Sequence, residues 1–65
     1  MKVRQLLQEL ERQGWAIARI KATHRHLKHP VLKGIVTVSG SINQDLPIGT
    51  LKYIQRQAKG FSLNQ

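Results

Sequence analysis

Apolar residues near the amino terminus recur at the spacing of one helical face. They stand at i, i+3, i+4 and i+7, as Val3, Leu6, Leu7 and Leu10. Because this spacing aligns side chains in a single stripe, we predict a helix from about Lys2 to Gln13. Gly14 follows at the position where glycine commonly ends a helix.

Shorter runs with β-branched and aromatic residues follow, separated by turn-forming residues. They predict three antiparallel strands, with Pro30 to Gly34 as the turn before the third. The predicted strands are Trp15 to Lys21, His24 to His29 and Ile35 to Val38. Alternation in the second strand places two sets of side chains on opposite faces. One set is His24, His26 and Lys28, and the other is Arg25, Leu27 and His29.

A polar loop from Ser39 to Asp45 precedes a second helix, whose first turn contains Pro47. Gly60 is its predicted stop. The predicted buried stripe of this helix is Ile48, Leu51, Ile54 and Ala58. The order is therefore α-β-β-β-α, which predicts a single α+β domain over residues 1–65. Two helices on one face of a three-stranded antiparallel sheet would leave the other face and its edge exposed.

Composition narrows the classes of partner. Eleven lysines and arginines oppose Glu9, Glu11 and Asp45, so the 65-residue chain carries a net charge of +8. Such a field attracts nucleic acid or an acidic protein. An anionic membrane surface is the weaker interpretation, because the first helix mixes carboxylates with its bases. The absence of cysteine excludes disulfides, and no apolar run approaches the roughly 20 residues of a membrane span, so we expect a cytoplasmic protein.

Residues 19 to 33 contain five of the basic residues and all three histidines, but no carboxylate. The segment therefore contains both positive charges that can bind phosphate and imidazoles that can transfer protons near neutral pH. The spacing of His24, His26 and His29 also suggests the hypothesis of a metal-binding site. His29 faces away from the other two, however, and no carboxylate or thiolate lies nearby to complete the site. We therefore predict neither a metal nor another cofactor.

Several motifs resemble those of the HicA family of toxins, over about residues 1 to 60. They are Thr23-His24-Arg25-His26, His29-Pro30, Lys33-Gly34-Ile35-Val36-Thr37-Val38 and Asp45-Leu46-Pro47-Ile48-Gly49-Thr50-Leu51. The resemblance implies a fold like that of double-stranded-RNA-binding domains, ribosome-independent mRNA interferase activity, and neutralisation by a HicB antitoxin. In that family a Gly-Ser-His motif opens the second strand and supplies the catalytic histidine. The matching positions here are Ala22, Thr23 and His24, so the resemblance assigns the catalytic role to His24. Alanine in place of the glycine would be strained if the position requires a positive φ.

RNA supplies its own nucleophile, the 2′-hydroxyl, so one histidine among cations nearly suffices for cleavage. Lys28 is the favoured phosphate ligand because it shares the face of His24, with Lys21 as a second cation. The full set of predicted RNA-binding residues is Lys21, Thr23, Arg25, His26, Lys28, Lys52 and Arg56. The last two form a basic stripe with Lys59, which is equally well explained as an ordinary solvated helix face.

Two other classes of function account for the same charge and fold. One is a non-catalytic RNA-binding module, and the other is a basic interaction protein for an acidic partner. Among the remaining residues, Trp15 is predicted to fill the core and not to stack on a base, and His29 to serve the turn at Pro30. Phe61 and Leu63 either pack back on the body or contact a partner.

Overall fold

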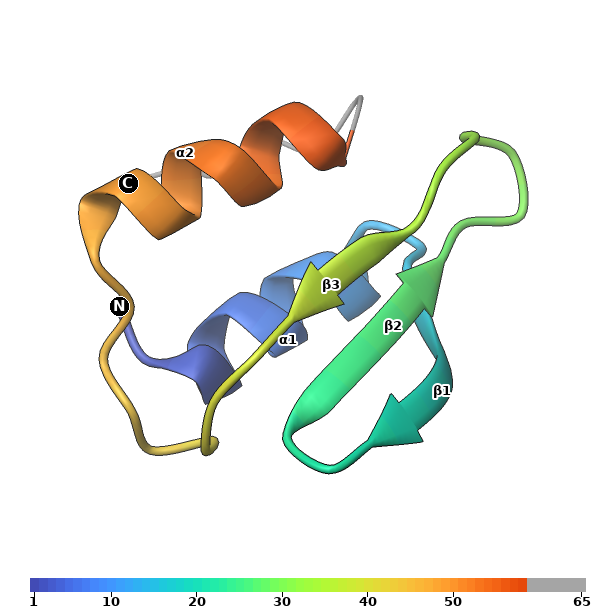
Figure 1. The fold of residues 1–65 in the computed structure, drawn as a ribbon. Coiled ribbons are helices and arrows are strands. Elements are labelled where there is room, and N and C mark those ends of the chain that lie inside the picture. Colours follow the sequence, from blue (N-terminus) through green and yellow to red (C-terminus); the bar gives the residue numbers. More distant parts are fainter. Residues whose placement is uncertain (59–65) are drawn as a thin grey trace.

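The structure is a computed structural model that describes residues 1–58 of the chain. It contains two helices and one three-stranded sheet (Figure 1). The elements, in order, are α1 (Val3–Arg12), β1 (Ala16–Lys21), β2 (His24–Lys28), β3 (Val36–Val38) and α2 (Ile48–Gln57). The predicted α-β-β-β-α order and the α+β class are confirmed. The predicted strands were each one residue too long, because Trp15, His29 and Ile35 lie just outside them.

The start of α1 is held by the loop that precedes α2. The first N–H groups of a helix lack partners within the helix. Here the N–H groups of Val3 and Arg4 each donate a 2.9 Å hydrogen bond, to the carbonyls of Gln44 and Ile42. Lys2 adds an ion pair to the same loop. These contacts join the amino terminus to residues 42–45, so that α1 and the chain entering α2 are tied together.

The end of α1 is a Schellman motif. The N–H of Gly14 donates to the carbonyl of Glu11 at 3.1 Å, and the N–H of Trp15 donates to that of Leu10 at 2.9 Å. Gly14 has a φ of +102°, which side chains disfavour. The predicted helix stop is therefore confirmed, and the motif turns the chain so that Trp15 enters the core directly after the helix.

The strands lie in the order β1-β2-β3, with antiparallel pairing on both sides of β2. β1 is an edge strand, and all six of its residues are exposed. In β3 the side chains of Val36 and Val38 are buried, as is that of Leu27 in β2. The sheet thus turns one face toward the interior at β2 and β3, while β1 extends beyond it.

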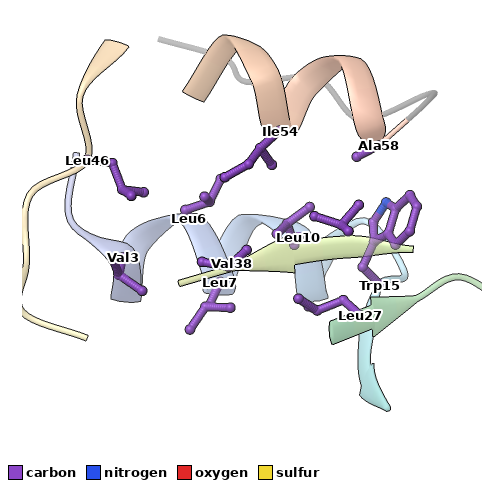
Figure 2. Close-up of a cluster of buried hydrophobic side chains, with 11 residues drawn as sticks. Val3, Leu6, Leu7, Leu10, Trp15, Leu27, Val38, Leu46, Ile54 and Ala58 are labelled. Carbon is purple, nitrogen blue, oxygen red and sulfur yellow. The ribbon is translucent and has the colours of Figure 1, made fainter. Parts of the chain in front are cut away.

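The core lies between this sheet face and the two helices, and Figure 2 shows their side chains converging on it. Its members are Val3, Leu6, Leu7, Leu10, Trp15, Leu27, Val36, Val38, Leu46, Ile54 and Ala58. Trp15 is only 1% exposed, so its predicted place in the core is confirmed. Because side chains of both helices belong to one cluster with Leu27, Val36 and Val38, both helices lie on the same face of the sheet, as predicted. We call the opposite face the open face.

The predicted buried stripe of α2 is wrong in its first residue. Ile54 and Ala58 are buried and Leu51 packs against them, but Ile48 is 71% exposed. Ile48 is the first helical residue and lies about 120° around the helix from Ile54, since a helix turns about 100° per residue. Only the later part of α2 therefore contributes to the core. The predicted stop at Gly60 lies outside the described residues, as do Lys59, Phe61 and Leu63.

Candidate functional site

A β-bulge in β1 decides which of its side chains share a face with the histidines of β2. Ile17 pairs with Leu27 and Arg19 pairs with His26, so Ala18 is the extra residue. Cross-strand partners lie on the same face of a sheet, and a bulge resets the alternation. Arg19 therefore lies beside His26 on the open face, whereas Ile17 stays with Leu27 on the other.

The open face gathers basic and imidazole side chains from two strands. Leu27 is buried in the core, so its neighbours in β2 point the opposite way. The cross-strand pairs add residues from β1 and β3 to the same face. The polar residues of the open face are Arg19, Lys21, His24, His26, Lys28 and Thr37. The chain's three carboxylates all lie elsewhere, on α1 and in the loop before α2. A phosphate approaching this face meets no opposing negative charge.

His24 is the first residue of β2 and stands directly opposite Lys21. Its side chain is exposed, and within residues 1–58 it makes no hydrogen bond. Lys28 shares the open face with His24, as predicted, but lies four residues along the strand, about 13 Å at the usual rise. The sequence favours Lys28 as the cation for His24, whereas the cation directly opposite His24 in the sheet is Lys21.

The turn that presents His24 is strained. Ala22 and Thr23 form a two-residue loop between β1 and β2, and Ala22 has a φ of 54°. A positive φ at the first central residue alone fits the type II′ pattern, which favours glycine there. Position 22 thus has the positive φ at which alanine is strained. The exposed Thr23 and the catalytic candidate His24 follow a backbone position that alanine adopts only at a cost.

Replacing Ala22 by glycine is expected to raise the free energy of unfolding by about 0.5–1 kcal/mol, since glycine adopts positive φ without strain but has more freedom when unfolded. Urea unfolding measures the change. Ala16→Gly is the control, because Ala16 is an exposed strand residue without positive φ. This variant should be less stable than the wild type. Equal destabilisation by the two variants would show that the turn is not strained.

His26 lies in a hollow on the open face. The hollow has a volume of about 440 Å³ and is lined by Ala18, Arg19, His26, Lys28 and Ile35. Nδ1 of His26 and the Thr37 hydroxyl are hydrogen-bonded at 3.0 Å. Within the described part of the chain Nε2 of His26 has no such partner. The ring is therefore held by β3, and its other nitrogen remains available in a hollow that Arg19 and Lys28 also line.

Arg25 lies on the other face, as alternation predicts. Its Nη1 donates a 2.9 Å hydrogen bond to the carbonyl of Gly40 in the loop after β3. Lys52 and Arg56 are exposed on α2, a helix that packs on the core side of the sheet. The structure therefore brings together Lys21, His24, His26 and Lys28, and places Arg25, Lys52 and Arg56 on other surfaces.

His29 serves the turn, as predicted. Its Nδ1 accepts hydrogen bonds from the N–H groups of Val31 (3.0 Å) and Leu32 (3.1 Å), and its Nε2 lies 3.0 Å from the Gln13 carbonyl. This pattern requires the neutral tautomer with its proton on Nε2. The ring also stands edge-on to Trp15, with centroids 5.3 Å apart. Across residues 1–58, no three potential ligand side chains are grouped so that they could hold a metal ion.

The comparison with protein families decides the classification. The family model of HicA toxins, which belong to bacterial toxin–antitoxin systems, matches residues 3–59, nearly the whole chain. The chain belongs to the HicA toxin family. No curated protein sequence matches it closely enough to indicate a relative. Membership of the HicA toxin family implies a neutralising partner protein and, in general, an RNA target. No helix in the described range is long and apolar enough to cross a bilayer.

Sequence reasoning missed two residues of this candidate site, Arg19 and Thr37. Arg19 lies two residues before Lys21 and pairs with His26, so alternation places it on the same face as Lys21, and Thr37 becomes visible only through its hydrogen bond to His26. One signal was present. Ile17 and Ile20 are three residues apart, a spacing that places both on the helix side of β1 only if an extra residue lies between them.

Proposed function

We propose that this HicA-family toxin is an endoribonuclease that cleaves mRNA in the cytoplasm without the ribosome, with His24 as its catalytic residue. The observation that carries the proposal is the position of His24. It is an exposed imidazole without a hydrogen-bond partner among residues 1–58, opposite Lys21 on a face without carboxylates. A histidine held in this way is available to a substrate and not committed to the fold. The family's Gly-Ser-His motif, matched here by Ala22-Thr23-His24, supports the same residue.

The proposed reaction is a transesterification within the RNA. His24 takes the proton from a 2′-hydroxyl, and the resulting oxygen attacks the adjoining phosphorus. A new bond between O2′ and phosphorus forms as the bond to the 5′ oxygen breaks. That oxygen takes up a proton from solvent water, and His24 releases the proton it accepted back to solvent, which yields a 2′,3′-cyclic phosphate and a 5′-hydroxyl. The RNA, the side chains and water supply every reactant, so the step needs no metal ion.

Lys21 is the cation proposed to stabilise the phosphorus oxygens in this reaction. It is the cross-strand partner of His24 and is exposed on the same face. A lysine acts on phosphate as a point charge and needs no fixed orientation. Negative charge grows on the non-bridging oxygens as O2′ attacks, so an ammonium group placed there lowers the barrier. Lys28 and His26 then bind the RNA farther along β2.

The neutralising partner is proposed to be a HicB-type antitoxin with an acidic contact surface. The net charge of +8 and the absence of carboxylates from the open face favour a partner of opposite charge. Such a partner would occupy the same side chains that bind phosphate. Antitoxin and RNA would therefore compete for the open face, and neutralisation would not require a change in the toxin's fold.

Incubating the purified protein with a long unstructured RNA in EDTA tests the proposal against its two rivals. We expect cleavage, with products that end in 2′,3′-cyclic phosphate and 5′-hydroxyl groups. Intact RNA with a salt-dependent mobility shift would indicate a non-catalytic RNA-binding module. Intact RNA without any affinity would indicate a protein whose charge serves only an acidic partner.

A further inference from the structure

The hollow on the open face is separate from the position of His24. Its lining combines two cations, Arg19 and Lys28, with the imidazole of His26 and the apolar side chains of Ala18 and Ile35. His24 does not line it. The family's histidine therefore stands at one end of the face, and a second, concave site lies beside it.

The chemistry of this hollow suits one phosphate with its attached sugar. Arginine binds phosphate through a planar fork, and here Arg19 stands opposite His26 on the neighbouring strand. The hydrogen bond between His26 and Thr37 orients the imidazole in the wall of the hollow. Ile35, 49% exposed, offers an apolar surface at the margin, where a sugar or base can pack. Such an anion site has no competing acidic side chain on its face.

The spacing along β2 relates the hollow to the cleavage site. His24 and His26 are two residues apart on one face, which corresponds to about 7 Å along a strand. Consecutive phosphates of an extended single strand of RNA have a similar separation. A strand lying along β2 with its scissile phosphate at His24 would therefore place a neighbouring phosphate in the hollow.

We propose that the hollow binds the phosphate adjoining the scissile one, with Arg19 as its principal ligand and His26, oriented by Thr37, as its second. The proposal rests on the proposed function, because it takes His24 as the cleavage site. It assigns Arg19 to substrate binding and implies that the RNA runs along β2 as an extended single strand. Lys28, at the far side of the hollow, adds a further positive charge.

The test uses short oligonucleotides that contain one ribose among 2′-O-methyl sugars, which fixes the position of the scissile phosphate. In two further substrates, the linkage on one or the other side of that phosphate is replaced by a neutral methylphosphonate. For the wild type we expect one of these replacements to lower kcat/KM by about 5- to 10-fold, the loss of one charge-assisted contact. For Arg19→Ala we expect the same replacement to change kcat/KM by less than twofold.

Arg4→Ala is the matched control, because Arg4 is an exposed arginine on α1, away from the open face. It should respond to the neutral linkage like the wild type, and Arg19→Gln should respond like Arg19→Ala. If Arg19→Ala is as sensitive to the neutral linkage as the wild type, the hollow is not the phosphate site, although His24-dependent cleavage stands. If the wild type cleaves none of the substrates, the proposed function fails and this inference falls with it.

Discussion

His24→Ala is expected to lower the rate of RNA cleavage by about 10²- to 10⁴-fold, the usual contribution of a general acid or base. The fold should be unaffected, because the side chain of His24 is exposed and makes no hydrogen bond within residues 1–58. RNA affinity should also change little, since the cations of the open face remain. Single-turnover cleavage of a defined RNA in EDTA measures the rate, and circular dichroism checks the fold.

Arg4→Ala provides the control for that experiment. It removes a positive charge from α1 and leaves the open face intact, so cleavage should stay within about twofold of the wild type, as expected for an exposed residue outside the site. A matching loss in both variants would mean that cleavage responds to net charge in general and not to the imidazole at position 24.

Gly14→Ala is expected to destabilise the protein by about 3 kcal/mol or more. A Cβ at this position would lie 2.6 Å from Nε2 of His29. The ring cannot easily move, since it is hydrogen-bonded to three backbone groups and packs against Trp15. Overpacking and a strained positive φ each cost about 1–3 kcal/mol. A domain of this size has only about 3–5 kcal/mol of stability from its core, so thermal unfolding should show a midpoint far below that of the wild type.

Gly34→Ala separates the cost of backbone strain from the cost of overpacking against His29. Gly34 has a φ of +96°, close to that of Gly14, but a Cβ there would have no atom within 4 Å. Its cost should therefore be backbone strain alone, about 1–2 kcal/mol. Equal losses of stability in the two variants would contradict the assigned role of His29 as a rigid support against Gly14.

Much of the fold follows from local patterns in the sequence. The stripe from Val3 to Leu10 predicts α1 because a helical period repeats over several turns, and Gly14 ends it because the Schellman motif needs positive φ. The strands are also recognisable, the first by Trp15 and its isoleucines, the second by the alternation of His24, His26 and Lys28 with Arg25 and Leu27, and the third by its valines. The exposure of Ile48 could not be predicted, because it depends on which part of α2 meets the core.

The candidate site was only partly predictable. The open face of β2 follows from alternation around Leu27, so His24, His26 and Lys28 could be grouped. The bulge at Ala18 could not be located, because it is set by pairing with another strand. Without the bulge, Ile17 would be assigned to the open face together with Arg19. Identifying the cation opposite His24 also required the register of the β1–β2 pair, which places Lys21 there.

Adding free imidazole to His24→Ala during RNA cleavage in EDTA shows whether the imidazole at position 24 performs the proton transfer. Position 24 is exposed, so a dissolved ring can reach the place of the missing one and take over its proton transfer. We predict that the variant is slow alone and becomes faster as the imidazole concentration rises, while the wild type does not respond. Cleavage by His24→Ala at the wild-type rate without imidazole would contradict the account.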